Sequence, residues 1–330
     1  MNFRKEQDIM KITVLDGYTL NPGDLSWEGL RRLGEVTVYD RTPPELVTER
    51  SRGAEIIFTN KTVLGAAQLA ELPDVKYIGV LATGYNVVDI AAAAQRGIVV
   101  TNIPDYGTKS VGQMTFALIL ELCNHVQAHS DAVCFGDWSR SRDFCFWNYP
   151  LTELAGKTIG IIGMGRIGRQ VAHLADAFDM KILGYSRTQD DGPGCRDFAW
   201  AGLEELLEEA DIVSLHCPLT SETKGMINKD RLHRMKKSAF LINTSRGPLI
   251  NEQELADALQ EGVIAGAALD VLSAEPPAED NPLVKAKNCI ITPHISWATR
   301  EARSRLMDIA AENLRSYLEG SIINRVNKPA

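Results

Sequence analysis

Residues 157–168 read Lys-Thr-Ile-Gly-Ile-Ile-Gly-Met-Gly-Arg-Ile-Gly, and the rest of the chain can be placed around this stretch. The run 158–162 is apolar and β-branched, which predicts a buried parallel strand. Glycines follow with the spacing G-x-G-x-x-G, and residues 166–178 carry apolar side chains at helical spacing. A strand, a glycine turn and a helix in this order are the context in which this spacing binds a dinucleotide. The alternative is a glycine-rich turn without a ligand.

Each glycine of this stretch has a predicted task. Gly163 permits the tight turn, Gly165 lets the backbone approach a pyrophosphate, and Gly168 lets helix and strand pack closely. The helix N-terminus, with Arg166 and Ile167, faces the phosphates with its backbone N–H groups. We therefore expect these five residues to contact the cofactor.

Length and composition are those of an ordinary globular protein. At 330 residues the chain exceeds what one hydrophobic core usually supports, so two domains are expected. The net charge of −8 argues against nucleic acid as a partner, and the sequence shows neither a secretory signal nor an apolar run of membrane-spanning length. The six cysteines are scattered without metal-binding spacing, which predicts free thiols, no metal and a cytoplasmic protein.

Short apolar runs alternate with helical patterns along most of the chain, which is typical of parallel α/β units. Strands are expected at residues 11–15, 36–39, 56–59, 77–80, 98–101, 158–162, 181–185, 212–215, 239–243, 264–269 and 289–292. Helices are expected at residues 26–33, 44–52, 66–72, 88–96, 109–126, 166–178, 203–209, 229–235, 252–261 and 299–319. The turn chemistry of residues 102–107 breaks the alternation and indicates a crossing between domains.

Two features near residues 121–149 lie outside this plan. His125 and His129 stand four residues apart with Glu121 one turn earlier, a spacing that can hold a metal. No other ligand is evident, so a packed or interface helix is favoured. Residues 135–149 are rich in aromatic side chains, which a partner subunit or the chain's own domain should cover.

The residues after the second strand of the glycine-loop domain bear on the choice of cofactor. A carboxylate is expected there, about 20 residues after the glycines, to bind the ribose of NAD. The sequence has Ser186, Arg187 and Thr188 instead. Ser186 removes the charge that would repel a 2′-phosphate, and its two neighbours can bind one, which favours NADP. Alternatively, Arg187 stacks on adenine and the protein uses NAD.

Three polar residues follow predicted strands in the second half of the chain: Arg246, Glu275 and His294. Ligands of open α/β sheets bind beyond the carboxyl ends of the strands, so we expect all three near the pyrophosphate site. Arg246 can hold a carboxylate or carbonyl by paired hydrogen bonds, and His294 can exchange a hydroxyl proton near neutral pH. Glu275 can hold the imidazole and favour its protonated form. The set suits the reduction of a 2-oxo acid, although each residue alone also has a purely structural interpretation.

Taken together, these residues resemble the D-isomer-specific 2-hydroxyacid dehydrogenases. The matching segments are the glycine loop 163–168, Leu215-His-Cys-Pro-Leu-Thr220, Asn243-Thr-Ser-Arg-Gly247, Ala268-Leu-Asp-Val271 with Glu275-Pro276, and Pro293-His294. They span nearly the whole chain. Two further segments, Asp16-Gly-Tyr and Ile295-Ser-Trp-Ala-Thr299, are most similar to the glycerate dehydrogenase or hydroxypyruvate reductase branch.

The resemblance implies an architecture. A Rossmann-type, doubly wound cofactor domain of residues 104–297 would be inserted into a flavodoxin-like substrate domain of residues 1–103 and 298–330. The helix after Tyr106 and the aromatic segment would build a homodimer. Two residues depart from the family pattern: Ser186 replaces its usual Asp, and Asn251 stands where Asp is common. Both Asn and Asp cap helices, so the second departure should have no consequence.

The resemblance also implies roles for individual residues. Arg246 would anchor the substrate, His294 would be the acid–base group, and Glu275 would be its partner. The backbone amides of Ala82, Thr83 and Gly84 would grip the substrate carboxylate. Further cofactor contacts would come from His216, Cys217, Pro218, Thr223, Thr244, Ser245, Asp270, Ser296 and Trp297.

The sequence therefore predicts an oxidoreductase that transfers a hydride between NAD(P)H and a small 2-oxo acid. Hydroxypyruvate and glyoxylate, reduced to D-glycerate and glycolate, are the expected substrates. One alternative is a cofactor-sensing binding protein on the same fold, similar to the corepressors of the C-terminal-binding type. Another is a dehydrogenase of the same family with a different substrate, such as D-lactate or phosphoglycerate.

Overall fold

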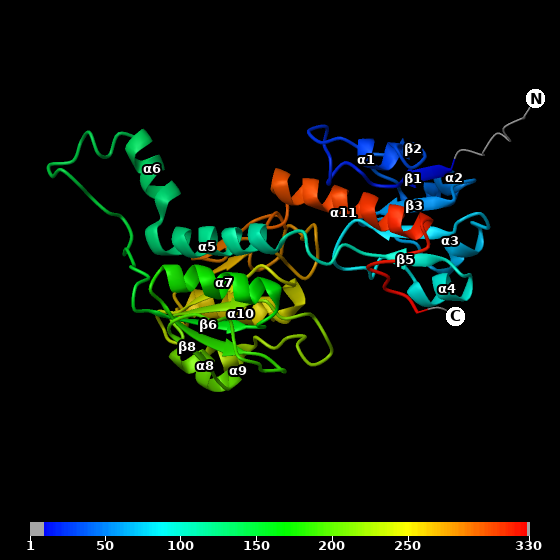
Figure 1. The fold of residues 1–330 in the computed structure, drawn as a ribbon. Helices are drawn as coiled ribbons and strands as arrows, with labels where there is room; N and C mark the ends of the chain where they lie inside the picture. Colours follow the sequence, from blue (N-terminus) through cyan, green and yellow to red (C-terminus); the bar gives the residue numbers. More distant parts are fainter. Residues whose placement is uncertain (1–9, 329–330) are drawn as a thin grey trace, which may run out of the picture. The chain divides into compact units, whose positions relative to one another are not determined.

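The computed structural model describes residues 10–328 and divides the chain into two compact units (Figure 1). Unit 1 combines the chain up to Gly107 with the chain from Ala298 onward, and unit 2 comprises Thr108–Trp297. The carbonyl of Tyr106 accepts hydrogen bonds from the Arg305 guanidinium at 3.0 and 2.9 Å, both within unit 1. The first connection therefore follows Gly107 rather than residue 103.

Unit 1 is built on a five-stranded parallel sheet in the order β2-β1-β3-β4-β5, which is the flavodoxin-like order. Its strands are β1 (Lys11–Val14), β2 (Glu35–Val38), β3 (Ile56–Thr59), β4 (Tyr77–Val80) and β5 (Val99–Thr101). Its helices are α1 (Glu28–Arg31), η1 (Pro44–Leu46), α2 (Val47–Ser51), α3 (Ala66–Ala70), α4 (Ile90–Gln95) and α11 (Arg300–Leu318).

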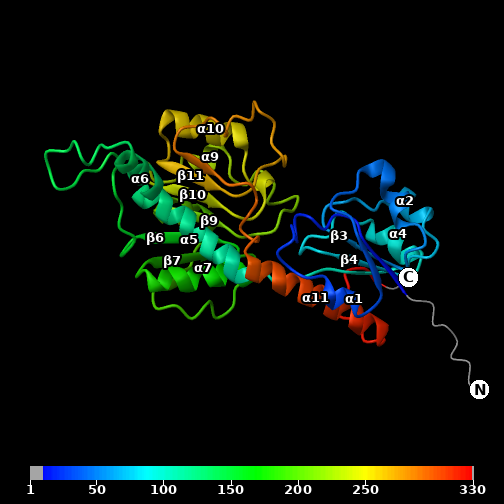
Figure 2. The same cartoon turned by 90° about the horizontal axis from the view of Figure 1, so that it is seen from above.

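The sheet of unit 1 is covered on both faces. Apolar side chains of α2, α3 and α4 pack with Ile57, Ile78 and Val100 on one face. On the other face α11 packs beside α1 and against β4 (Figure 2). The rings of Tyr77 and Tyr317 lie 4.9 Å apart there. Burial on both faces explains why these strands read as nearly continuous apolar runs.

Unit 2 is built on a seven-stranded parallel sheet in the order β12-β11-β10-β9-β6-β7-β8. Its strands are β6 (Thr158–Ile162), β7 (Lys181–Tyr185), β8 (Phe198–Trp200), β9 (Ile212–Leu215), β10 (Phe240–Asn243), β11 (Gly266–Leu269) and β12 (Cys289–Ile291). The chain winds outward from β6 through β7 and β8, and then returns to β9 on the other side of β6. The strand order thus reverses between β6 and β9, where ligands of such sheets bind.

Successive residues of these strands point to opposite faces, and each face has its own core. Ile159, Ile212 and Ile242 pack with α5 (Thr108–Asn124) and α7 (Arg166–Ala177). Val213 and Leu241 pack with α8 (Leu203–Glu209), α9 (Lys229–Leu232) and α10 (Glu252–Glu261) on the other face. Figure 1 shows α5 and α7 on one side of the sheet and α8 and α9 on the other. The short helix η2 (Gly247–Leu249) follows β10. The predicted class, α/β with a doubly wound parallel sheet and a flavodoxin-like second domain, is confirmed.

The segment between α5 and β6 differs most from the sequence prediction. His125 adopts a left-handed backbone conformation, with φ of 48°, and interrupts the helix before a separate α6 (Val126–Cys134). The following residues extend away from the body of unit 2 in both views (Figures 1 and 2). We call residues 126–151 the arm. The short strand β8 was also not predicted, because three residues are too few to show a periodic pattern.

No described helix has the length and apolarity to span a membrane. No group of three or more His, Cys, Asp and Glu side chains in this part of the chain could hold a metal ion.

Candidate active site

The carboxyl ends of seven parallel strands form one edge of unit 2, and the predicted site residues of that unit lie in the loops after them. The glycine loop follows β6, Ser186 follows β7, and His216 follows β9. Arg246 follows β10, the Glu275 loop follows β11, and His294 follows β12. The sheet therefore brings these loops to a common edge.

Each glycine of the loop after β6 lies in the environment that its predicted task requires. Gly163 has φ of 104°, and a Cβ there would lie 2.5 Å from the backbone nitrogen of Cys217. A Cβ on Gly168 would lie 2.1 Å from the Gly163 carbonyl oxygen. A Cβ on Gly165, by contrast, would meet no atom within 4 Å. Gly163 and Gly168 are thus required by the fold itself, whereas the space beside Gly165 stays open at the N-terminus of α7, where a pyrophosphate would fit.

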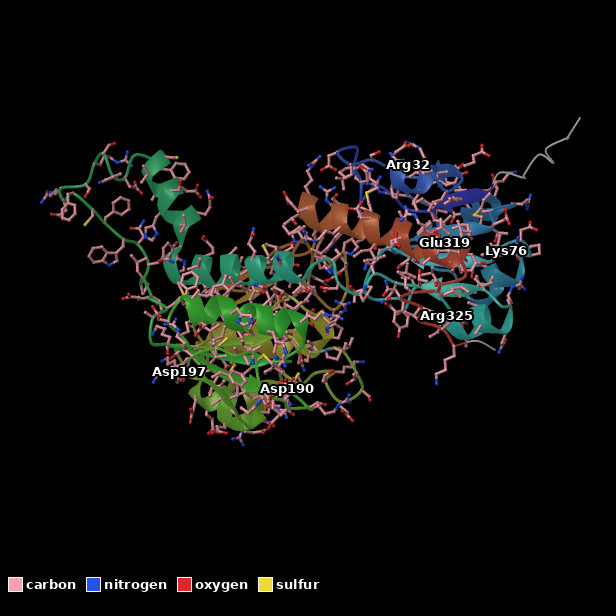
Figure 3. All side chains as sticks on the ribbon, viewed as in Figure 1. Arg32, Lys76, Asp190, Asp197, Glu319 and Arg325 are labelled. Atoms are coloured by element: carbon pink, nitrogen blue, oxygen red, sulfur yellow. The ribbon has the colours of Figure 1, made fainter. Side chains whose placement is uncertain are left out.

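The loop after β7 carries the residues predicted to select the cofactor. Ser186 is half-buried, and Arg187 and Thr188 are exposed. Asp190, labelled in Figure 3, lies further along the loop. It accepts a hydrogen bond from the Arg169 guanidinium of α7 at 2.5 Å. This bond holds the pKa of Asp190 below its usual value. The carboxylate of Asp190 is therefore paired with a cation on the helix that begins at the glycine loop.

His216, at the end of β9, is held beside the sheet. Its Nε2 lies 2.8 Å from the Ser214 hydroxyl, and burial lowers the pKa of His216 to about 3. A histidine that stays neutral near pH 7 is a poor acid–base group. Two hydrogen bonds hold the residues that follow His216 in this loop. The Cys217 carbonyl accepts from the Ser245 hydroxyl at 2.8 Å, and the Pro218 carbonyl accepts from the Thr223 hydroxyl at 2.7 Å.

Buried Asn243 shapes the loop that presents Arg246. Its amide donates to the Arg246 carbonyl at 2.9 Å, and its Oδ1 accepts from the Ser245 backbone N–H at 3.0 Å. The hydroxyl of Thr244 lies 3.1 Å from that of Thr115 on α5. Arg246 itself is exposed, donates to the Ser245 carbonyl at 2.7 Å, and forms no ion pair with any described carboxylate. Its remaining donors can therefore bind an anionic ligand.

The backbones of the loops after β10 and β11 are in close contact at Gly247. A Cβ on Gly247 would lie 2.0 Å from the carbonyl carbon of Leu272 and 2.4 Å from the nitrogen of Ser273. These distances leave no room for any side chain at position 247. The backbone that carries Arg246 therefore rests directly on the backbone that leads to Glu275.

Glu275 and His294 meet as the sequence analysis expects. Glu275 Oε2 lies 2.6 Å from His294 Nδ1, and Glu275 Oε1 accepts from the Leu272 backbone N–H at 3.1 Å. A carboxylate only accepts hydrogen bonds, so Nδ1 must carry the proton. The other ring nitrogen, Nε2, has no hydrogen-bond partner among the described residues, and 30% of the His294 side chain is exposed. This nitrogen is available to exchange a proton with a ligand.

The backbone of His294 is also unusual, because its φ of 54° lies in the left-handed region. Its N–H donates to the carbonyls of Asp270 and Thr292 at 2.8 and 2.9 Å. Asp270 and Ser296, both predicted to contact the cofactor, are buried and bonded to each other through their side chains. Trp297 follows as the last residue of unit 2 and is half-buried.

The predicted substrate loop lies in unit 1, after β4. The Ala82 carbonyl accepts from the Ile103 N–H at 3.0 Å, and the Thr83 hydroxyl donates to the Ile103 carbonyl at 2.8 Å. The Asn102 amide donates to the Thr83 carbonyl at 2.7 Å. No backbone N–H of residues 82–86 donates to another residue in the described chain. These amides, including that of Gly84, are available to bind an anion.

Residues that support the site from segments distant in the chain were not predicted. Arg169 supports the loop after β7, and Ser110 of α5 donates to the Ser296 carbonyl at 2.5 Å. Neither carries a signal in the sequence, since each bond joins segments far apart in the chain. Asn243 had a local signal, because an Asn before turn residues often bonds to the backbone two or three positions on.

Comparison with known proteins identifies the class to which this fold and site belong. Residues 116–296 match the model of the D-isomer specific 2-hydroxyacid dehydrogenase NAD binding domain. The chain is 52% identical over 322 residues to a hydroxypyruvate reductase of Blautia hydrogenotrophica, which covers 97% of this chain and 100% of the relative. It is 41% identical to a glycerate dehydrogenase of Methylorubrum extorquens, over 88% of this chain and 92% of the relative.

A solved structure agrees with these relatives. The NADPH-dependent glyoxylate/hydroxypyruvate reductase of Sinorhizobium meliloti, in complex with NADP and malonate, is 30% identical and superposes with a TM-score of 0.81 over 97% of both chains. The class is that of the oxidoreductases that act on CH–OH groups with a nicotinamide cofactor. The chain belongs to the D-isomer-specific 2-hydroxyacid dehydrogenase family.

Proposed function

We propose that the protein reduces hydroxypyruvate and glyoxylate, reversibly, to D-glycerate and glycolate. Unit 2 would bind the nicotinamide cofactor and unit 1 the acid. The observation that carries the proposal is the contact of 2.6 Å between Glu275 and His294, beside a loop that presents the unpaired guanidinium of Arg246. The names of the hydroxypyruvate reductase, glycerate dehydrogenase and glyoxylate reductase relatives support this choice of substrate.

The roles of the residues follow from their chemistry. A bound nicotinamide supplies or accepts the hydride. Arg246 binds the substrate carboxylate or carbonyl through its fork of N–H groups, and so fixes the carbonyl carbon in place. His294 Nε2 donates the proton to the carbonyl oxygen during reduction and takes it back during oxidation. Glu275 fixes the tautomer and orientation of the imidazole through Nδ1.

The remaining predicted contacts support binding. The free amides of residues 82–86 would bind the substrate carboxylate, and the open space beside Gly165 would take the pyrophosphate. His216, Cys217, Pro218, Thr223, Thr244 and Ser245 would line the cofactor, since their loops lie at the same sheet edge. A cofactor-sensing binding protein on the same fold is the alternative, and turnover of a 2-oxo acid by the purified protein separates the enzyme from it.

The test is a substrate panel with a variant. Purified protein is assayed with hydroxypyruvate, glyoxylate, pyruvate and phenylpyruvate, using NADH and NADPH. We expect the highest kcat/KM for hydroxypyruvate or glyoxylate. Arg246→Ala should lower that kcat/KM about 10³-fold, because the substrate loses both its anchor and its orientation. Full activity in this variant, or no turnover of any 2-oxo acid by the unaltered protein, would contradict the proposal.

We propose NADP as the preferred cofactor. Ser186 places no charge at the end of β7, Arg187 and Thr188 are exposed beside it, and Asp190 is paired with Arg169. A 2′-phosphate there would meet a cation and a hydroxyl rather than a free carboxylate. NAD remains the alternative, with Arg187 stacked on adenine.

We propose further that the arm pairs two copies of the chain as a homodimer. Its side chains are unusually exposed for their size: 77% of Phe135, 88% of Phe144 and 66% of Trp147. An apolar surface of this kind usually marks a protein contact. Light scattering should give twice the mass of the chain, and Phe144→Ser with Trp147→Ser should lower it toward the monomer.

The six cysteines, all free, suit a reducing cytoplasm.

A further inference from the structure

The chain between β7 and β8 is attached to one face of α7 at two places. Arg169 and Asp176 lie seven residues apart in that helix and so share a face. Near the start of α7, the Arg169 guanidinium donates to Asp190 at 2.5 Å. Near its end, Asp176 accepts from the Arg196 guanidinium at 3.3 Å. Segment 190–196 is therefore held to the helix by an ion pair at each of its own ends.

The pair near the start of α7 also sets the local shape of this segment. Arg169 donates to the Gly192 carbonyl at 2.6 Å as well as to Oδ2 of Asp190. Oδ1 of Asp190 accepts from the Gly192 N–H at 2.9 Å, and the Asp190 carbonyl accepts from Trp200 Nε1 at 3.0 Å. The Asp190 carboxylate is thus directed at α7, although 61% of its side chain is exposed.

This carboxylate lies next to two parts of the predicted dinucleotide site. Arg169 directly follows Gly168, so the pair lies close to the N-terminus of α7, where a pyrophosphate would fit. Asp190 also lies four residues after Ser186, at the end of β7, where sheets of this type bind the ribose of the cofactor. Four residues span at most about 14 Å of chain. Over such distances a carboxylate and a phosphate still affect each other, most of all at low salt.

The charge that a ligand meets at the end of β7 depends on Arg169. A phosphate group carries a charge near −2, and an unpaired carboxylate beside it would repel it. While Asp190 is paired with Arg169, its charge is balanced by that of the guanidinium. Arg187 makes no ion pair within the described part of the chain, and so remains available as a cation.

We propose that Arg169 is a positioning residue for cofactor choice, which binds Asp190 and so prevents its carboxylate from opposing a 2′-phosphate at the end of β7. Arg169 acts through Asp190 and does not itself contact the phosphate. The inference rests on the proposed function, in which unit 2 binds a nicotinamide dinucleotide with a preference for NADP. It adds a second determinant of that preference, on α7 rather than in the loop after β7.

The experiment measures, by calorimetry, how the whole protein binds 2′,5′-ADP and 5′-AMP. These probes differ only in the 2′-phosphate, so the ratio of their dissociation constants reports that group and needs no turnover. Arg169→Gln should weaken binding of 2′,5′-ADP about tenfold, because the Asp190 carboxylate is then free to repel the phosphate. Binding of 5′-AMP should change less than about twofold. Equal weakening of both probes would contradict the inference.

Two further variants separate charge from loop structure. Asp190→Asn removes the charge while Arg169 keeps its bond to the Gly192 carbonyl, so 2′,5′-ADP should bind about threefold more tightly. Arg169→Gln combined with Asp190→Asn lacks both the guanidinium and the carboxylate. We expect it to bind 2′,5′-ADP within about threefold of the unaltered protein. If the double variant binds as weakly as Arg169→Gln alone, Arg169 acts only on loop structure and the inference is wrong.

The matched control is Arg196→Gln, which breaks the ion pair near the other end of α7. Asp176 and Asp179 accept from Arg196 at 3.3 and 2.9 Å, so this pair joins the same segment to the end of the same helix, away from the glycine loop. Binding of neither probe should change. Asp191→Asn removes an exposed neighbouring carboxylate that forms no bond with Arg169 in the described chain, and should change the ratio less than about twofold. A larger change than in Arg169→Gln would assign the effect to net charge and overturn the inference.

The proposed function can fail separately from this inference. If the unaltered protein binds 5′-AMP more tightly than 2′,5′-ADP, the proposed preference for NADP is wrong. The change from Arg169→Gln to the double variant still decides whether Arg169 acts through Asp190. If the variants behave as expected but the protein reduces no 2-oxo acid with NADPH or NADH, the proposed enzyme is wrong and the inference about Arg169 holds.

Discussion

Along the carboxyl edge of the sheet in unit 2, the loop after β6 and the loops after β11 and β12 take their conformations from different kinds of contact. At β6, the loop takes its shape from missing side chains, since a Cβ on Gly163 or Gly168 would collide with backbone. At β11 and β12, the loops take their shape from side chains that are present, because buried Asp270 accepts four hydrogen bonds from the segment around His294. Steric limits at two glycines set the backbone in the first half, and hydrogen bonds to a buried carboxylate set it in the second.

The difference decides what each half can do. A loop of small residues brings backbone N–H groups close to a ligand and suits an extended pyrophosphate. A loop held by a buried carboxylate keeps one imidazole in one orientation, which suits proton transfer to a single atom. Three experiments test whether the two halves of this edge act separately.

The largest effect is expected at the imidazole. His294→Asn should lower kcat about 10³-fold, because the side chain can no longer exchange a proton, while cofactor affinity is retained. Steady-state kinetics and fluorescence titration measure the two quantities. His233→Asn, an exposed histidine at the end of α9, is the control and should retain kcat. Loss of cofactor affinity in His294→Asn would show that the two halves are not separate.

The second test uses one substitution at two glycines. Gly165→Ala should leave the thermal midpoint unchanged and weaken cofactor binding about tenfold, because the new methyl group meets no protein atom and enters the ligand's space. Gly168→Ala should lower the free energy of unfolding by about 1–3 kcal/mol, since its Cβ would lie 2.1 Å from the Gly163 carbonyl. Calorimetry and titration distinguish them. Equal effects on stability would mean that Gly165 is also a packing residue.

The smallest effect is expected at the end of β7. Ser186→Asp should shift the ratio of kcat/KM for NADPH over NADH by about tenfold toward NADH, because the new carboxylate repels a 2′-phosphate and can bind a ribose hydroxyl. The ratio is measured at fixed hydroxypyruvate. Thr188→Ser, which keeps the hydroxyl, should leave it nearly unchanged. If the aspartate variant keeps the original ratio, the proposed preference for NADP does not depend on this position.

The two halves also differ in how much of them the sequence predicts. The glycine loop was predicted in detail, because strand, turn and helix are contiguous and Gly163 and Gly168 each have a local steric reason. Glu275 and His294 were predicted as a pair by their places after strands, and the structure brings them to 2.6 Å. The bonds that hold them were not predicted. Ser110 and Ser296 lie 186 residues apart, and nothing local to either residue indicates their contact.

In the fold, too, features with a local sequence pattern were predicted and features that depend on distant contacts were not. Long alternating segments gave the strands and helices of both sheets, because burial on two faces produces apolar runs that are easy to recognise. The break at His125 and the short strand β8 were missed. A left-handed residue inside a helical pattern and a strand of three residues depend on tertiary contacts, which periodicity does not report.

Gly247 restricts how enzymes of this design can diverge. With the backbone of Leu272 and Ser273 pressed against it, the arginine and glutamate loops form one rigid piece that no side chain at this position can separate. Under the proposed function, new substrate preferences would arise in the loop after β4, where Thr83, Tyr85 and Asn86 are exposed. An engineer who seeks a larger acid as substrate should randomise residues 83–86 and leave position 247 untouched.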